Sequence, residues 1–102
     1  MAINNVAIGT SATALYTSTG QSATTCLFAC NTSGGAVTLS LYIVPNGDTP
    51  GSANIVLDEL SIPAGDTYMM NAEKIVLENG DSIQGVAGTG SALVSTISYV
   101  SI

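Results

Sequence analysis

Glu78 and Asp81 are the two side chains whose types and spacing are best suited to joint chemistry. They flank Asn79-Gly80, a dipeptide typical of a two-residue hairpin turn. In such a hairpin the two carboxylates lie directly opposite each other, where like charges repel. Two carboxylates with nearby carbonyl oxygens can bind a hard cation, but no ladder of further acidic residues follows. We therefore interpret Glu78 and Asp81 as solvated carboxylates, with a weak cation site as the alternative, and expect no metal.

Cys26 and Cys30 are the only thiols, and they could form a disulfide or bind a soft metal. In a strand over 24–31 they share one face, and four residues at about 3.3 Å each separate their Cα atoms by roughly 13 Å. A disulfide needs Cα atoms within about 7 Å, and a zinc site needs further soft ligands. We expect two small buried hydrophobic residues that flank Phe28, with an intermolecular disulfide or a redox role left open.

The remaining composition offers little for catalysis. The chain has 102 residues with seven acids, Lys74 as the one basic residue, and no His or Trp. Without His, no imidazole can activate a Ser or Cys nucleophile. A glycosidase needs paired carboxylates at a groove, and we expect neither a deep groove nor an aromatic platform in so small a chain. Lys74 neighbours Glu73 and is expected to form an ordinary ion pair. We predict no enzyme activity and no cofactor.

Charge is scarce and unevenly placed. Charged residues are 8% of the chain, against about 25% in an average soluble domain. All of them lie between Asp48 and Asp81, so the first 47 and the last 21 residues carry none. One cation cannot neutralise a phosphate backbone, and the net charge of −6 repels it. Nucleic acid is therefore not an expected partner.

Length and hydrophobic runs indicate one domain over residues 1–102. The longest apolar run, 41–44, is far shorter than the roughly 20 residues that cross a membrane, so no membrane association is expected. No basic segment opens the chain, and we expect synthesis in a cytoplasm without a secretory signal. Asn31-Thr32-Ser33 matches a glycosylation acceptor, which we interpret as coincidence.

Period-two alternation is the main structural signal, clearest where Val37, Leu39, Leu41 and Ile43 alternate with polar or small residues. Turn residues separate such runs, and 31–35 and Asn79-Gly80 are expected to be hairpin turns. The Asp58-Glu59 pair could instead sit on a short helical turn. The pattern predicts an all-β fold, an antiparallel β-sandwich or jelly-roll-like barrel of about eight short strands. The expected strands lie near 3–8, 12–18, 23–31, 36–44, 54–62, 66–71, 74–78 with 81–87, and 91–102.

The uncharged ends predict association. Edge strands of lone domains are usually protected by Lys, Pro or inward charges, and the strands outside 48–81 have almost none of these. We expect other copies or a larger assembly to cover these strands. The alternative is that Ser and Thr side chains alone keep these faces solvated. Tyr and Met are enriched at interface cores. The candidate contact anchors are therefore Tyr16, Tyr42, Tyr68, Met69 and Met70, although the tyrosines could also line the rim of the core.

Two segments carry a resemblance. Residues 30–44 form a strand ending in Asn, a short Ser/Gly turn and an alternating strand, and residues 75–85 contain Gly80-Asp81-Ser82-Ile83 after an apolar strand. In order of elements, residues 23–102 resemble small β-sandwich virion proteins of tailed bacteriophages, which include capsid decoration (cement) proteins and tail- or neck-associated modules. The resemblance implies a structural role in the virion, many copies and no catalysis.

Three functions follow as hypotheses. The first is a decoration protein that stabilises capsomer contacts, with the major capsid protein or other virion proteins as partners and a homo-oligomer, for example a trimer, as its form. The second is an adaptor of the tail, neck or fibre base. The third is a small module that binds carbohydrate or a host surface, which requires an exposed aromatic row or a cation at Glu78 and Asp81.

Overall fold

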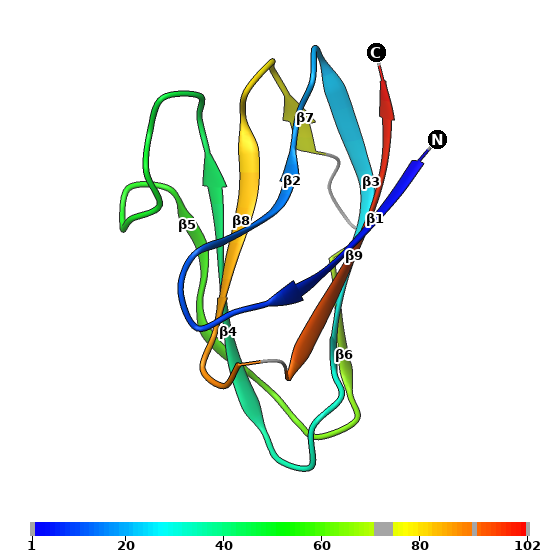
Figure 1. The fold of residues 1–102 in the computed structure, drawn as a ribbon, viewed down its shortest axis with the longest axis vertical. Coiled ribbons are helices and arrows are strands. Elements are labelled where there is room, and N and C mark those ends of the chain that lie inside the picture. The colour runs from blue at the N-terminus through cyan, green and yellow to red at the C-terminus, as the bar shows by residue number, and fades with distance from the viewer. Residues whose placement is uncertain (1, 71–74, 91, 102) are drawn as a thin grey trace.

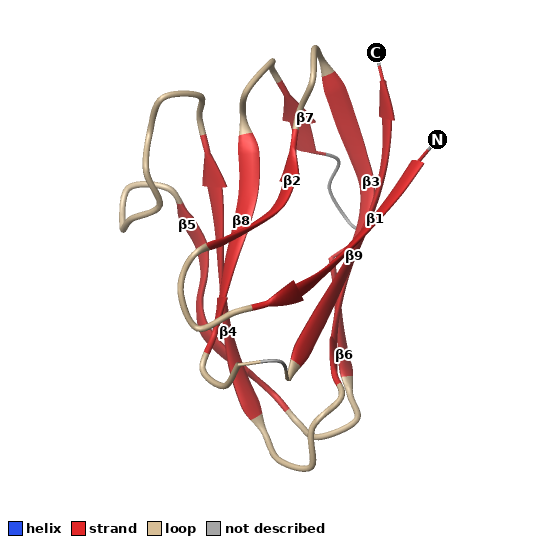
Figure 2. Cartoon of the chain, in the orientation of Figure 1, coloured by secondary structure: helices blue, strands red, loops and turns tan. Residues whose placement is uncertain are grey.

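Nine β-strands and no helix form the described part of the chain, residues 2–70, 75–90 and 92–101, in the computed structural model (Figures 1 and 2). The predicted strands are all present within about two residues, and 55–62 is a strand rather than a helical turn. The strands are β1 (Ala2–Ile8), β2 (Thr13–Thr17), β3 (Ser22–Asn31), β4 (Val37–Val44), β5 (Ile55–Ile62), β6 (Thr67–Met70), β7 (Ile75–Leu77), β8 (Ser82–Ala87) and β9 (Leu93–Ser101).

The strands form two antiparallel sheets packed face to face. Sheet A has the order β1-β9-β3-β6, with β7 also paired to β3, and sheet B has the order β2-β8-β4-β5. Along the chain, β1 therefore pairs with β9, β2 with β8, β3 with β6 and β7, and β4 with β5. This is one long hairpin, wrapped so that β9 also meets β3 and β8 also meets β4. Such wrapping defines a jelly-roll sandwich.

Two expected hairpins are absent. β7 pairs with β3, whereas β8 pairs with β2 and β4, so the Asn79-Gly80 turn joins the two sheets and is not a hairpin. The 31–35 loop likewise leads from β3 in sheet A to β4 in sheet B. Both predictions of a hairpin were wrong because turn residues specify a chain reversal and do not specify which strand the next one pairs with. The pair β4–β5 is a true hairpin.

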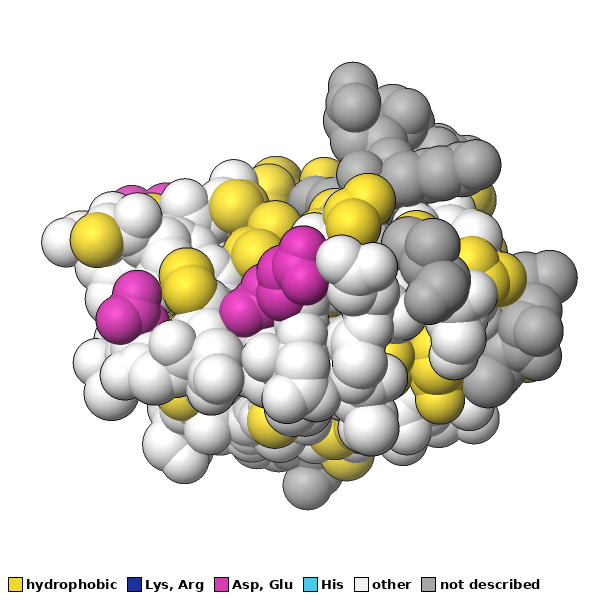
Figure 3. All heavy atoms as spheres, turned by 90° about the horizontal axis from the view of Figure 1, so that it is seen from above, with side chains coloured by type: hydrophobic (Ala, Val, Ile, Leu, Met, Phe, Trp, Pro, Cys, Tyr) yellow, Lys and Arg dark blue, Asp and Glu magenta, His cyan; other side chains and the backbone are white. Residues whose placement is uncertain are grey.

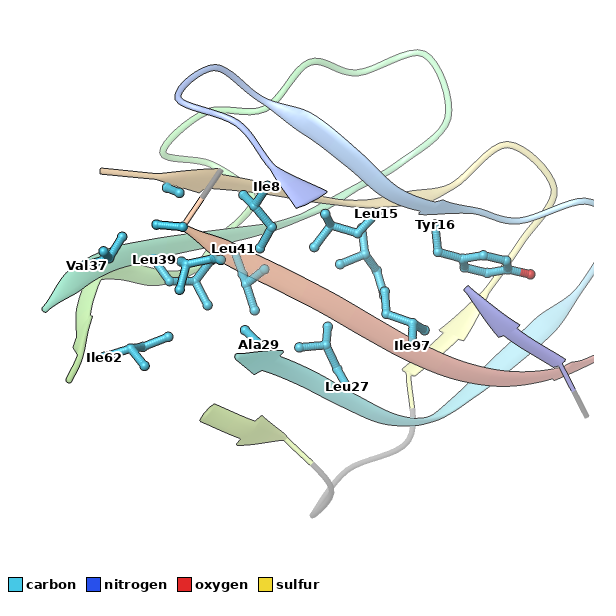
Figure 4. Close-up of a cluster of buried hydrophobic side chains, with 14 of the residues drawn as sticks. Ile8, Leu15, Tyr16, Leu27, Ala29, Val37, Leu39, Leu41, Ile62 and Ile97 are labelled. Carbon is cyan, nitrogen blue, oxygen red and sulfur yellow. The ribbon is translucent and has the colours of Figure 1, made fainter. Parts of the chain in front are cut away.

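The core lies between the sheets and draws on both (Figure 4). The alternation predicted for β4 is confirmed for Val37, Leu39 and Leu41, which are buried, whereas Ile43 is only partly buried against the core. Each fully buried aliphatic side chain contributes about 1.5–3 kcal/mol relative to exposure. In β8, a Cβ on Gly85 would come within 3.2 Å of Leu15 Cδ1, so glycine permits β2 to approach closely. The other large core residues are Ile8, Leu27, Ile62, Leu77, Ile83, Leu93 and Ile97.

β5 is an irregular edge strand. Its register with β4 shifts on both sides of Leu41, and Glu59 has a φ of 52°, a backbone conformation that non-glycine residues rarely adopt. The Glu59 amide donates to Ser40 Oγ at 3.1 Å instead of to a ladder carbonyl. The exposed Asp58-Glu59 pair thus marks a bulge in a strand.

Asn31 organises the loop that leaves sheet A. Its Nδ2 donates to the carbonyls of Gly35 and Ile62, both at 2.8 Å, and its Oδ1 accepts from the Ser33 amide and hydroxyl. The side chain is fully buried. The amide nitrogen is therefore inaccessible to glycosylation, which supports the interpretation of Asn31-Thr32-Ser33 as coincidence.

Candidate interaction surface

The five predicted anchors do not form one surface. Tyr42 is half-buried opposite Gln84 on sheet B. Tyr68 is half-buried and packs against the core, and Met69 is exposed on sheet A. Met70 ends β6, and its side chain lies outside the described part of the structure.

Tyr16 belongs to the core. Its side chain is 9% exposed, and its ring centroid lies 4.2 Å from that of Tyr99. Its hydroxyl donates to Ser22 Oγ at 2.9 Å, and Ser22 in turn bonds to Ser18. A side chain this buried offers a partner almost no surface, so Tyr16 fills the core-rim role that the sequence also allowed.

The outward row of sheet A forms a different candidate surface. The register places side chains from all five strands of sheet A on one face, opposite the core. None of these residues is charged, and antiparallel sheets that meet solvent on one face usually carry polar residues there. We call this set the outer face of sheet A; it consists of Ile3, Asn5, Ala7, Cys26, Phe28, Cys30, Thr67, Met69, Val76, Val94, Thr96, Ser98 and Val100.

Exposed large hydrophobic side chains concentrate on this face. Ile3, Val76, Met69 and Val94 are 68%, 61%, 51% and 36% exposed. Among the described residues only Val56, on β5, is comparable elsewhere. Selection of contact anchors by residue type, which favoured Tyr and Met, did not include Ile3, Val76 and Val94. In residues 93–101, alternation alone places Val94 among the outward-facing side chains. Ile3 lies on the same face only because β1 pairs with β9.

Both cysteines lie on the outer face of sheet A. The prediction that Cys26 and Cys30 share a face with Phe28 is confirmed, but the prediction that they are buried was wrong, because both are free and half-exposed. The inward positions of β3 are taken by Leu27, Ala29 and Asn31. Because both faces of this strand are rich in apolar residues, alternation alone could not decide which one meets the core.

The acidic residues lie elsewhere. Asp58 and Glu59 are on the β5 edge, and Asp48, Asp66, Glu78 and Asp81 are in connecting loops and turns. All of these acids are exposed except Asp81, which is half-buried. Figure 3 shows acidic side chains on one end of the sandwich. Glu73 and Lys74 fall outside the described residues.

Asp81 has a structural task at the 78–81 turn. One carboxylate oxygen accepts a hydrogen bond from the backbone N–H of Asn46 at 2.8 Å, and the other accepts one from the backbone N–H of Glu78 at 3.0 Å. Glu78 accepts two bonds from Gln21 Nε2, at 3.0 and 3.1 Å. These contacts tie three loops together. The described residues contain no group of three or more potential metal ligands, so nothing adds to this weak cation candidate.

A small hollow lies between the end of β5 and the start of β6. Its volume is about 170 Å³, and its lining includes Asp66 and Tyr68. Pockets for drug-sized ligands usually span about 300–1,000 Å³. One carboxylate at a hollow of this size does not define a catalytic or cofactor site.

Comparisons with known proteins add no relative. No protein-family model, no curated protein and no solved structure matches this chain. Within the described residues there is also no helix of the length and hydrophobicity that crossing a membrane requires.

Proposed function

We propose that this chain is a non-catalytic structural protein of a bacteriophage virion, a capsid decoration (cement) protein that stabilises contacts between capsomers. The supporting observation is the uncharged outer face of sheet A, which holds four of the five exposed large hydrophobic side chains among the described residues. Large hydrophobic side chains that gather on one exposed face are typical of an interaction site. The resemblance to phage β-sandwich proteins supplies the virion as the setting.

The mechanism is passive burial. Association places Ile3, Met69, Val76 and Val94 against apolar surface of the major capsid protein, which stabilises the contact by about 25 cal/mol per Å² buried. Because this face carries no ion pairs, the association depends only weakly on salt. A rigid two-sheet sandwich holds these side chains in fixed positions, so little ordering accompanies binding.

The alternatives differ in what they require. An adaptor of the tail, neck or fibre base could use the same face, and copy number separates it from a decoration protein. A carbohydrate-binding module requires an exposed aromatic row or a cation at Glu78 and Asp81. In the described residues Tyr16 is buried and the other aromatic side chains, Phe28, Tyr42, Tyr68 and Tyr99, are half-buried, so no exposed row supports this hypothesis. No third metal ligand joins Glu78 and Asp81 there either.

Two measurements test the proposal. Quantitative mass spectrometry of purified particles of the encoding phage should find a copy number close to that of the major capsid protein or a simple fraction of it. A number that matches one tail or neck ring favours the adaptor, and absence from particles overturns a virion role.

Binding to emptied capsids provides the second test, with a matched pair of variants. Val76→Glu should abolish binding of the purified protein, whereas Val56→Glu, which introduces the same charge at the exposed position on β5, should retain it. Equal loss in both variants, or no binding by the wild type, contradicts docking through the outer face of sheet A.

A further inference from the structure

β1 is an unprotected edge strand. It ends sheet A, and within the described residues its only strand partner is β9. Its seven residues pair with β9 in unbroken register, without a bulge. The segment contains no charged residue and no Pro. The free side of such a strand is a template for another strand.

The other three edges are each interrupted. β5 carries two register shifts, the positive φ of Glu59 and two exposed carboxylates. β2 has five residues with a register shift after Ala14, and its Leu15 carbonyl accepts from Asn4 Nδ2. β6 and β7 have only four and three residues. β1 alone combines length, regularity and absence of charge.

We propose that β1 pairs antiparallel with β1 of a second copy across a two-fold axis, joining the two A sheets into one. Pairing odd residues with odd residues keeps both outer faces on the same side, because side chains alternate along a strand. Asn5 opposite Asn5 is the one such register that pairs all seven residues. It places the large Ile3 of each copy opposite the small Ala7 of the other.

The charge distribution favours a second copy as the occupant. The chain carries a net charge of −6, so two copies repel each other unless they meet at a surface that carries none of the acids. The described acids lie on β5 of the other sheet and in loops, and none lies on β1 or β9. The β1 seam is therefore a contact at which two copies meet without opposing charges, and it gives the expected homo-oligomer a specific geometry.

The first test is register-specific cross-linking of the full chain in a Cys26→Ser, Cys30→Ser background. Asn5→Cys places two thiols on directly opposite residues, whose Cα atoms are about 4.5–5.5 Å apart, within disulfide range. Ala7→Cys is the matched control: in this register the two thiols are offset by four residues, roughly 13 Å. The expected result is a covalent dimer under mild oxidation with Asn5→Cys only.

The second test is the dimer affinity of the otherwise wild-type chain by analytical ultracentrifugation. Asn5→Lys places two like charges opposite each other and should raise the Kd about fivefold at low salt, with partial recovery at high salt. Thr17→Lys adds the same charge on the exposed surface of β2 and should leave the Kd unchanged. Thermal unfolding of each variant controls for loss of fold.

Each outcome has a clear meaning. A wild-type chain that stays monomeric at all concentrations overturns the proposal, as does a dimer that both cysteine variants cross-link equally. A monomer that is present in virions refutes the β1 seam and leaves the proposed function intact. A β1 dimer that is missing from virions supports the β1 seam and refutes the proposed function.

Discussion

Sheet A and sheet B share one core but meet the outside with different chemistry. The outer face of sheet A has no charged residue and carries four exposed large hydrophobic side chains. Among the described residues, sheet B carries one such side chain, Val56, and its β5 edge also carries Asp58 and Glu59. The same alternation thus serves two purposes. On sheet B it separates the core from water, and on sheet A both faces of the strands are suited to contact with protein.

The largest expected effect separates the inner from the outer face of sheet A. Ile97→Ala should lower the free energy of unfolding by about 2–5 kcal/mol, because Ile97 is fully buried and its loss leaves a cavity. Ile3→Ala, on the exposed face, should change it by less than about 0.5 kcal/mol. Urea unfolding measures both. Equal costs would show that the outer face is covered within the protomer.

The next effect distinguishes structural from solvated acids. Asp81→Ala should destabilise the fold by about 1–3 kcal/mol, since the Asn46 and Glu78 amides lose their acceptor. Asp48→Ala, in the loop at 45–54, should stay within about 0.5 kcal/mol of wild type. Thermal unfolding at neutral pH compares the two variants. A neutral result for Asp81→Ala would remove its role in tying the loops.

A smaller effect compares the two sheets directly. Val76→Thr should leave the free energy of unfolding within about 0.5 kcal/mol of wild type and should weaken retention on a hydrophobic-interaction column. Val56→Thr should be equally neutral in stability and should change retention less, because Val56 lies on sheet B, whereas the other four exposed large hydrophobic side chains of the described residues lie on sheet A. Identical retention changes would mean that the outer face of sheet A is not a continuous apolar patch.

The smallest perturbation uses the native thiols. Cys26 and Cys30 should react with a water-soluble thiol reagent in the folded protein, because both lie half-exposed on the outer face. In a Cys26→Ser, Cys30→Ser background, Ala29→Cys should react only on unfolding, since Ala29 is fully buried. Protection of the native thiols in the purified protein would place a second copy or another molecule over this face.

Alternation predicted most of the fold. Strand positions and the buried set of Val37, Leu39 and Leu41 follow from period two alone, because a side chain's face is a local property. What failed depends on distant segments. The Asn79-Gly80 turn does not show which sheets the strands on its two sides join, because β7 pairs with β3, about fifty residues earlier in the chain.

The candidate surface was less predictable than the fold. Leu15 and Tyr16 are consecutive yet both buried, because the register of β2 shifts between Ala14 and Tyr16, and a bulge cannot be located from alternation. Cys26 and Cys30 show the complementary limit. Their shared face was predictable, but its outward direction depends on packing of the whole strand between β6, β7 and β9.

The pairing of β1 with β9 has a consequence for how the protein is made. Sheet A cannot be completed until residues 93–101 have left the ribosome, because β9 lies between β1 and β3. Such long-range pairing folds slowly, and domains of this kind expose strand edges to neighbouring nascent chains in the meantime. The 2–8 segment therefore stays without its strand partner until residues 93–101 have been made, and an uncharged segment in that state is most exposed to aggregation before the fold forms.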